Sequence, residues 1–173
     1  IVFVESGYEM LEAPFEIARG QHVTLRGRID RIDYHRGTNT VRILDYKTGD
    51  KAVTPEKAHR KKEEWIDLQL PLYRHLWRTA VPKKVVPDGA AVELAYFQIP
   101  KVLDEVDVAR AEEWSDAVLD DADAKAREVI MGVLAEDFWP PTSPPPDYFE
   151  DYAAICLDRQ QAPRLADDEE GNA

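Results

Sequence analysis

Apolar and polar residues alternate in two neighbouring stretches, residues 22–35 and 40–47, which are rich in Ile, Val, Leu and Thr. A short polar segment around Gly37 separates them. This pattern predicts a β-hairpin in which Gly37 takes the positive φ that a tight turn demands. Short apolar stretches in residues 1–20 predict one or two further strands, interrupted at Ala13-Pro14.

A helical pattern follows the hairpin. Asp67 suits an N-cap, and Pro71 is tolerated only near the first turn, so we expect the regular helix to begin close to Asp67. Residues 50–64, which precede it, are polar and predict a connection that is disordered or partly helical. The apolar residues that recur at helical spacing are Trp65, Leu68, Leu72 and Leu76.

The remainder of the chain predicts one folded domain over residues 1–161 and a disordered acidic tail over residues 162–173. Prolines between residues 140 and 146 predict an extended segment before the tail. The other expected elements are a buried strand at residues 91–99, an edge strand at 102–108 and a long helix at 109–134.

The net charge of −12 argues against a nucleic-acid binder, because polyanion binding needs a basic surface. The distribution of charge softens this objection. Residues 51–62 contain four Lys and one Arg against a single acid, Glu56. Acidic residues gather instead in residues 116–123 and 167–170, and the ordinary interpretation of such runs is a solvated surface.

The chain has one cysteine, Cys156, which excludes an internal disulfide and any multi-cysteine zinc or iron–sulfur site built from this chain alone. A reducing, cytoplasmic setting is therefore expected. No apolar run approaches the roughly 20 residues of a membrane-spanning helix. The first residues are charged too early for a signal peptide, and the missing initiator Met is typical of a fragment or a processed chain.

The hairpin pattern also predicts which residues face each other. If Gly37 and Thr38 are the two loop residues, Asp30 lies directly opposite Asp45, and Arg28 lies opposite Lys47. Side chains alternate along a strand, so these four residues share one face with apolar residues nearer the turn. On the other face, this register pairs two charged residues across the strands, Asp33 and Arg42.

Two carboxylates directly opposite each other repel, and a fold tolerates them when a cation sits between them. Mg²⁺ suits two carboxylates together with waters and phosphate oxygens. Lys47, two residues beyond Asp45, could orient an attacking water or stabilise charge on a phosphate. The alternative is a half-exposed hairpin with scattered charges, and a one-residue slip would move Asp30 and Asp45 to opposite faces.

Gln69 and Tyr73 stand four residues apart, one above the other on the predicted helix. The functional interpretation has Gln69 reaching the metal site or a phosphate backbone, with Tyr73 contacting nucleic acid. The alternative is a polar shoulder of an ordinary helix. The basic residues 51–62 lie between the two motifs, where an entering DNA strand could meet them.

Together these residues resemble the RecB-like branch of the PD-(D/E)XK nucleases over about residues 1–156, with order, spacing and strand–strand–helix context all matching. The chain is most similar to the C-terminal nuclease domain of AddB-type helicase–nuclease subunits. The three motifs are Gly27-Arg28-Ile29-Asp30-Arg31-Ile32-Asp33, Asp45-Tyr46-Lys47-Thr48-Gly49 and Gln69-Leu70-Pro71-Leu72-Tyr73.

The resemblance implies a restriction-endonuclease-like α/β fold, with a mixed central β-sheet flanked by helices. It implies that Asp30 and Asp45 are Mg²⁺ ligands, with Mn²⁺ as a substitute ion, and that the Tyr46 carbonyl is a further ligand. Lys47 would be the catalytic lysine. Gln69 and Tyr73 would form the Q-x-x-x-Y motif of this branch, and Arg28 would support the site.

The sequence departs from the family at both ends. Relatives often have a metal-site His or Glu on a helix before the first strand, and we expect that element upstream of residue 1. Glu5 matches an acid seen in relatives, whereas His22 and His35 do not fit the missing position. AddB-type relatives often carry a C-terminal cysteine motif for an iron–sulfur cluster. Here only Cys156 of that motif remains, so no cluster is expected.

The expected function is therefore metal-dependent DNA cleavage, by an exonuclease module of a helicase–nuclease that acts in recombination and repair. Expected partners are DNA and a helicase region or partner subunit, with no membrane. The alternative is a catalytically inactive DNA-binding or scaffolding module that keeps the nuclease fold. A fragment of an active enzyme that is itself inactive is a third possibility.

Overall fold

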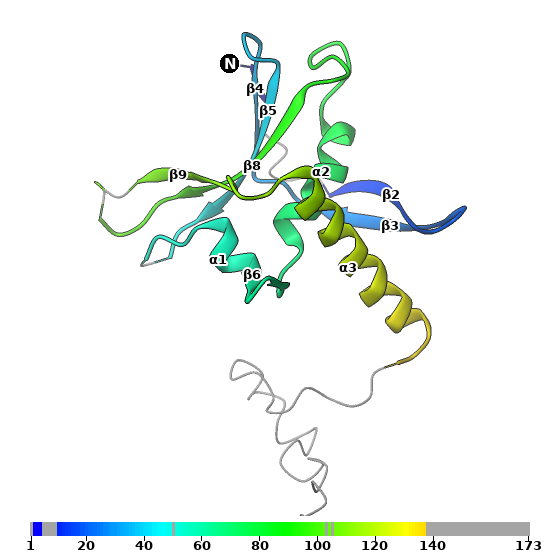
Figure 1. Ribbon diagram of the computed structural model, residues 1–173. Helices are drawn as coiled ribbons and strands as arrows, with labels where there is room; N and C mark the ends of the chain where they lie inside the picture. Colours follow the sequence, from blue (N-terminus) through cyan, green and yellow to red (C-terminus); the bar gives the residue numbers. More distant parts are fainter. Residues whose placement is uncertain (1, 5–9, 50, 103, 105, 138–173) are drawn as a thin grey trace, which may run out of the picture. The chain divides into compact units, whose positions relative to one another are not determined.

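The computed structural model describes residues 2–4, 10–49, 51–102, 104 and 106–137 (Figure 1). The chain divides into two compact units, residues 1–131 and 132–173, and every element discussed below as part of the site lies in the first. The elements are β1 (Val2–Val4), β2 (Leu11–Ala18), β3 (Gln21–Gly27), β4 (Arg31–His35), β5 (Thr40–Lys47), α1 (Pro55–His59), β6 (Arg60–Lys61), β7 (Glu64–Trp65), α2 (Gln69–Ala80), β8 (Ala91–Gln98), β9 (Asp107–Arg110) and α3 (Asp116–Leu134).

The central sheet has five strands in the order β1-β4-β5-β8-β9. Strand β5 pairs antiparallel with β4 and parallel with β8, so the sheet is mixed. A parallel pair needs a crossover connection, and the segment containing α1 and α2 supplies it between β5 and β8. The mixed sheet flanked by helices agrees with the fold class predicted from the sequence.

One face of the sheet forms the main core. The apolar side of α2 packs against Val41 and Ile43 of β5 and against Leu94 of β8, which all point to the same face. A helix of this length is only marginally stable by itself, so the burial of its apolar side against the sheet supplies most of its stability. The residues that α2 contributes to this core are Leu70, Tyr73, Leu76 and Trp77.

The predicted hairpin register is confirmed between β4 and β5, where Ile32 faces Ile43 and Tyr34 faces Val41. The turn differs from the prediction. Pairing stops one step earlier, and the positive φ belongs to Asn39, at 51°, rather than to Gly37. Asn tolerates this conformation better than most residues. Its side chain accepts a hydrogen bond from the Tyr34 hydroxyl at 2.9 Å, which holds the turn against the sheet.

Residues 22–35 do not form the single strand that was predicted. Strand β3 ends at Gly27 and pairs with β2 in a separate two-stranded sheet, while β4 begins at Arg31 in the central sheet. The chain therefore changes sheets between residues 28 and 30, where Ile29 is fully buried. Arg28 and Asp30 are consequently not ladder positions opposite Lys47 and Asp45, and that part of the prediction was wrong.

Gly27 permits this change of sheet because it lies against helix α2. A Cβ atom at Gly27 would stand 2.8 Å from Leu76 Cδ1 and 3.4 Å from Tyr73 Cε1. Two carbon atoms prefer about 3.5–4.0 Å, so only glycine fits without displacement. The absence of a side chain at this position brings the end of β3 next to the helix that bears Gln69 and Tyr73.

We expect Gly27→Ala to lower the free energy of unfolding by about 1–2 kcal/mol, because the new methyl group overpacks the contact with buried Leu76. Urea unfolding measures this change. Gly132→Ala in α3 is the matched control, since its Cβ would meet no atom within 4 Å. In a helix, that substitution should raise stability by about 0.5–1 kcal/mol. Equal stabilities of Gly27→Ala and the wild type would contradict the close packing.

The boundaries of other elements also differ from those predicted from the sequence. Pro14 does not interrupt the first strand but lies within β2, which among the described strands pairs with β3 alone, and proline is tolerated on such an edge strand. Helix α2 begins at Gln69, so Trp65 belongs to β7 and not to the helix. Pro71 lies in the first turn, as predicted. The N-cap residue is Leu68 rather than the predicted Asp67, although the Asp67 carboxylate accepts the N–H of Gln69, the first helical residue, at 2.7 Å.

The predicted edge strand at 102–108 is displaced to β9, and the predicted helix at 109–134 begins seven residues later, at Asp116. Helix α3 attaches to α2 through Asp123, a buried carboxylate that accepts a hydrogen bond from His75 and pairs with Arg74, each at 2.8 Å. Such pairing is what permits a charge to be buried. In the described part of the chain, no helix is long and apolar enough to cross a membrane.

Several sequence predictions concern residues outside the described part. They are Glu5, the proline-rich segment at 140–146, Cys156 and the tail from residue 162.

Candidate functional site

A cavity of about 340 Å³ opens where the end of β3, strand β5 and helix α2 meet. Its walls bring together five of the residues singled out from the sequence, although they come from three separate segments. Lys47 and Tyr46 are not among the lining residues. The cavity is lined by Leu25, Arg26, Gly27, Arg28, Asp30, Asp45, Gln69, Leu72, Tyr73 and Leu76.

Asp45 is the most buried acid of the site, with 6% of its surface exposed. Strand alternation places it on the face of β5 that also buries Val41 and Ile43. Burial raises the pKa of Asp45; the nearby Lys47 ammonium opposes this rise, and the charge of Asp30 adds to it. The folded chain therefore holds a carboxylate where ionisation is unfavourable unless a cation is near.

Lys47 Nζ lies 2.7 Å from Asp45 Oδ2 in an ion pair. The Lys47 ammonium is therefore the partner of this buried carboxylate oxygen. Lys47 is half-exposed, and its ammonium stands 4.7 Å from the centroid of the Tyr96 ring. This is the distance range of a cation–π contact. The lysine is thus held between a carboxylate and an aromatic ring on one face of the sheet.

Asp30 lies in the bend just before β4, at a level where β5 has no strand partner on that side among the residues that the structure describes. Its Oδ2 accepts the Tyr46 N–H at 2.7 Å, so the side chain takes the place of the missing strand. The N–H and C=O of one extended residue point toward the same edge. The Tyr46 carbonyl therefore faces the same edge of β5 as Asp30.

Gln69 and Tyr73 join the two acids from the first turns of α2. Gln69 Nε2 donates a hydrogen bond to the Tyr73 hydroxyl at 2.7 Å. Burial raises the pKa of Tyr73 to about 12, opposed by the Gln69 hydrogen bond and assisted by the charges of Asp45 and Asp30. The phenol is therefore neutral at physiological pH and can act as a hydrogen-bond donor or acceptor in the cavity.

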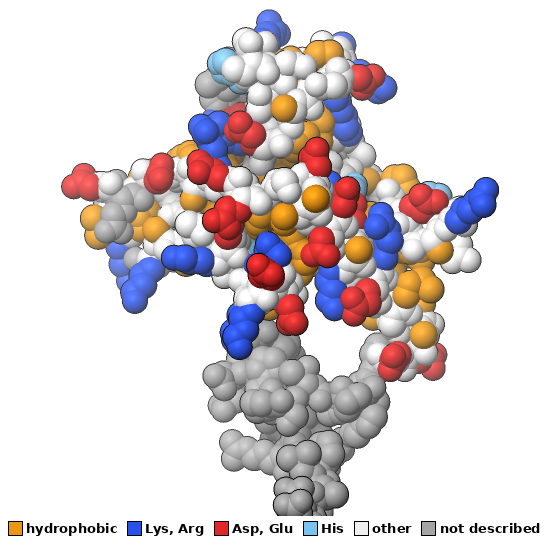
Figure 2. Space-filling view, viewed as in Figure 1, with side chains coloured by type: hydrophobic (Ala, Val, Ile, Leu, Met, Phe, Trp, Pro, Cys, Tyr) orange, Lys and Arg blue, Asp and Glu red, His pale blue; other side chains and the backbone are white. Residues whose placement is uncertain are grey.

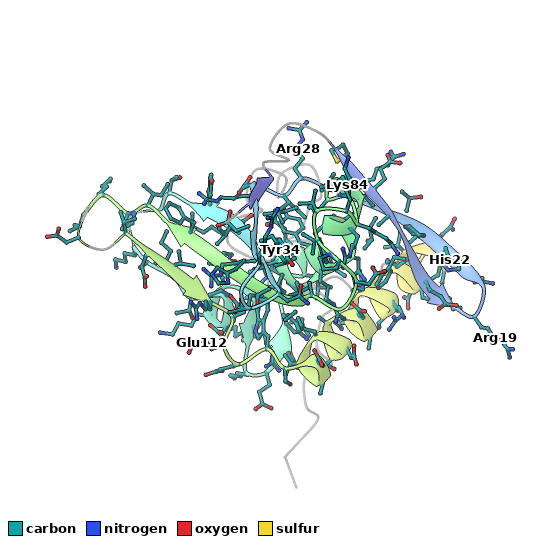
Figure 3. The ribbon with its side chains drawn as sticks, turned by 90° about the horizontal axis from the view of Figure 1, so that it is seen from above. Arg19, His22, Arg28, Tyr34, Lys84 and Glu112 are labelled. Atoms are coloured by element: carbon teal, nitrogen blue, oxygen red, sulfur yellow. The ribbon has the colours of Figure 1, made fainter. Side chains whose placement is uncertain are left out.

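Arg28 lines the cavity from its rim. It is exposed, and in Figure 3 its side chain reaches outward from the ribbon. His22 lies toward the tip of the β2–β3 hairpin, beside the end marked by Arg19 and away from Arg28 (Figure 3). His22 is thus far along the hairpin from the site, and His35 lies next to the turn at the other end of β4.

Asp33 and Arg42 face each other in the ladder, as predicted, but their side chains take other ionic partners, so the predicted charge pair is wrong. The Asp33 carboxylate instead accepts hydrogen bonds from Arg31, at 2.7 and 3.1 Å. Arg42 pairs with Glu93 of β8 at 2.8 Å. Because β5 is flanked on both sides, Arg42 has an acid opposite it on each neighbour, and hairpin register alone could not decide between them.

Sequence reasoning missed three residues that support the site. His59, in the connection predicted to be disordered or partly helical, is 1% exposed and contacts the Tyr96 hydroxyl. Gln98 is buried on β8 opposite Lys47 and donates a hydrogen bond to the Val53 carbonyl. This bond ties the loop between β5 and α1 to β8. Tyr96 offered a signal, because a tyrosine within a buried strand needs a partner for its hydroxyl. His59 and Gln98 offered none.

The residues present fit a hard divalent cation. Asp30 and Asp45 supply two carboxylates to one cavity, and Mg²⁺ prefers such oxygen ligands with waters completing its shell. No group of three or more His, Cys, Asp or Glu side chains able to hold a metal occurs within the described residues. Further oxygen ligands there could come from the Tyr46 carbonyl, from the Gln69 side-chain amide that lines the cavity, or from water.

The face of the molecule that Figure 2 shows does not carry one uniform charge, because acidic and basic side chains are interspersed on it. In the basic segment at residues 51–62, Lys51, Lys57, Lys61 and Lys62 are exposed, whereas Arg60 donates a hydrogen bond to the Glu63 carbonyl at 2.7 Å. These four lysines are accessible to a polyanion.

Comparison with known proteins agrees with this geometry. The model of the PD-(D/E)XK nuclease superfamily matches residues 3–156. No curated protein and no solved structure matches the chain. Members of this superfamily are typically nucleases and generally use divalent metals, and the mixed sheet flanked by helices is consistent with their fold. The family match covers most of the chain, and this chain therefore belongs to the PD-(D/E)XK nuclease superfamily.

Proposed function

We propose that this chain is a divalent-metal-dependent DNA nuclease of the RecB-like branch. The observation that carries the proposal is the buried Asp45 carboxylate, which shares one cavity with Asp30 and forms an ion pair with Lys47. A fold that places the buried Asp45 beside the half-buried Asp30 loses stability unless cations compensate their charge. Asp30, Asp45 and the Tyr46 carbonyl would hold Mg²⁺.

The bound ion would supply positive charge to the scissile phosphate and lower the pKa of an attacking water. The chain's own residues supply the orientation. Lys47, held between Asp45 and the Tyr96 ring, would hold the attacking water or donate to a phosphate oxygen. The paired Gln69 and Tyr73 would position the substrate backbone from the opposite wall of the cavity, and Arg28 would contact a phosphate at the rim.

The three motifs of the RecB-like branch further support a role as the exonuclease module of a helicase–nuclease in recombination and repair. In that setting DNA is the substrate, and a helicase region or partner subunit feeds a strand to the cavity. The exposed Lys57, Lys61 and Lys62 lie in the segment that joins the Lys47 strand to helix α2, where an entering strand would pass.

The direct test incubates the 173-residue chain with linear DNA labelled at either end, with Mg²⁺, Mn²⁺ or EDTA. We expect degradation with either ion and none with EDTA, and stepwise loss of nucleotides from one end. Absence of cleavage in every condition, from a folded chain that binds Mn²⁺, would reject the activity for this chain by itself. Full activity in EDTA would reject the metal mechanism.

A non-catalytic DNA-binding module is the second candidate. It is favoured by the observation that the described residues offer only two acids in the cavity, with no third His or acidic ligand. Calorimetric titration of the chain with Mn²⁺ distinguishes the two. A nuclease site should bind Mn²⁺ at a defined stoichiometry that Asp30→Asn abolishes, whereas a degenerate site should show no specific binding.

A further inference from the structure

His59 is a buried side chain behind the proposed nuclease site, and none of the motifs includes it. It ends helix α1, and both of its ring nitrogens are engaged. Nδ1 lies 2.9 Å from the Asp67 carbonyl, and Nε2 contacts the Tyr96 hydroxyl. A backbone carbonyl can only accept, so Nδ1 carries the proton of this hydrogen bond. Trp114 packs edge-on against the same ring, at 5.4 Å between centroids.

The contact with Tyr96 leads to the lysine of the site. Tyr96 lies on β8 directly beside Asp45 of β5, and its ring stands under the Lys47 ammonium. Tyr96 is almost fully buried, and burial raises the pKa of its hydroxyl, so the phenol stays neutral and its hydroxyl needs a partner. His59 supplies that partner and thereby fixes the plane of the ring against which Lys47 rests.

The contact with Asp67 leads to the helix of the site. His59 Nδ1 is also 3.5 Å from Asp67 Oδ1, and this interaction holds the pKa of the Asp67 carboxyl below its ordinary value. The ionised carboxylate accepts the backbone N–H of Gln69 at 2.7 Å, at the positive end of the α2 dipole. The backbone N–H groups of Ile66 and Asp67 donate to the His59 carbonyl, which closes the loop around the imidazole.

We propose that His59 is a positioning residue of the nuclease site, acting through Tyr96 on Lys47 and through Asp67 on Gln69. The inference rests on the proposed function, because it assigns a purpose to residues that this function uses. His59 touches neither the cavity nor the acids that line it. Its loss should therefore lower the rate of the chemical step more than the affinity for DNA, since misplacing a catalytic group affects kcat more than KM.

The first test reads the position of Lys47 directly, in the metal-free full chain labelled with ¹³C-lysine. The Lys47 ε-methylene signal, assigned by its loss in Lys47→Arg, should be shifted upfield by the Tyr96 ring current. We expect His59→Ala and Tyr96→Phe to move this signal toward the exposed lysines. Tyr34→Phe is the matched control, because it removes a buried tyrosine hydroxyl from the turn end of the same sheet face and should leave the signal in place.

The second test measures steady-state DNA cleavage by the same variants. Tyr96→Phe should lower kcat by about tenfold with an unchanged KM, and His59→Gln, which keeps a side-chain donor, should recover part of the loss caused by His59→Ala. If His59→Ala does not fold, Tyr96→Phe tests the same contact by removing a single oxygen. Tyr34→Phe should retain wild-type kcat.

The outcomes separate this inference from the proposed function. An unmoved Lys47 signal, or a wild-type kcat in folded Tyr96→Phe, would overturn the positioning role even if the wild type cleaves DNA. A shift of the signal in Tyr96→Phe and His59→Ala but not in Tyr34→Phe would support the placement of Lys47 by His59, even if the isolated chain proved unable to cleave DNA.

Discussion

Asp45→Asn is expected to abolish metal-dependent DNA cleavage, with a loss of at least about 10³-fold in kcat/KM. The amide keeps the size of the side chain and removes the charge that would hold the cation. Calorimetric titration should show that Mn²⁺ binding disappears together with activity. Cleavage at a wild-type rate by Asp45→Asn would sink the proposed site, because no other residue of β5 places an acid in the cavity.

In the metal-free chain, the same substitution should stabilise the fold at neutral pH. Burial raises the pKa of Asp45, so the folded chain binds this proton more tightly than the unfolded chain does. The resulting destabilisation is absent below the ordinary pKa of 3.8, grows as pH rises through the raised pKa, and is complete above it. Asparagine removes this contribution, so the stability advantage of Asp45→Asn should increase from acidic to neutral pH.

Denaturant unfolding of both proteins in EDTA, near pH 4 and near pH 7, checks this prediction. Saturating Mg²⁺ should then stabilise the wild type and leave Asp45→Asn unchanged, because only a folded protein with the site gains binding free energy. Asp33→Asn is the matched control: Asp33 pairs with Arg31 outside the cavity, so this variant should retain the response to Mg²⁺. If the free energies of unfolding of the wild type and Asp45→Asn differed by the same amount at both pH values, the pKa of Asp45 would be the same in the folded and unfolded chain, which would contradict the prediction.

Lys47→Ala is expected to lower kcat by about 10²–10³-fold while metal binding persists. The lysine supplies a positive charge next to Asp45 but no ligand, so its removal should leave Mn²⁺ bound, or bound more tightly through the loss of a repelling cation. Cleavage assays and calorimetry on one preparation separate this behaviour from that of Asp45→Asn, which should lose both properties.

The control for this prediction is Lys83→Ala. Lys83 is exposed and pairs with Asp88 in the loop after α2, so the variant removes a lysine of equal charge without touching the cavity. It should retain wild-type kcat. Equal losses in Lys47→Ala and Lys83→Ala would indicate that overall charge, rather than a placed ammonium group, explains the effect.

Much of the site could be predicted from the sequence because its parts are local. Side-chain alternation places Asp45 and Lys47 on one strand face whatever that strand packs against, and helical spacing stacks Gln69 and Tyr73 in any regular helix. The register of β4 with β5 followed from a short connection between two alternating strands. The periodicity of the backbone decides these features within a few residues.

Only the tertiary structure decided how the local parts meet. The change of sheet between residues 28 and 30 depends on Gly27 lying against Leu76, which belongs to a helix far along the chain. The alternating pattern does not contain this contact, so it predicted one continuous strand where the structure has β3 and β4. Arg42 forms an ion pair with Glu93 rather than with Asp33, because strand β8 pairs with β5 on the side away from β4 and places Glu93 next to Arg42. Asp30 does line the cavity, but its side chain is held there by the hydrogen bond from the Tyr46 N–H and not by a pairing position in the β-ladder.

His59 shows most clearly the difference between what the local sequence predicts and what long-range packing decides. Nothing in the polar residues 50–64 distinguishes it from a surface histidine, since its burial depends on Tyr96, Trp114 and Asp67, which come from three later segments. The sequence by itself determined which chemistry this chain can present: two acids, a lysine and a glutamine–tyrosine pair. The long-range packing decided which of those groups share one cavity and what holds them there, because contacts between distant segments are set by competition among all possible partners and not by backbone periodicity.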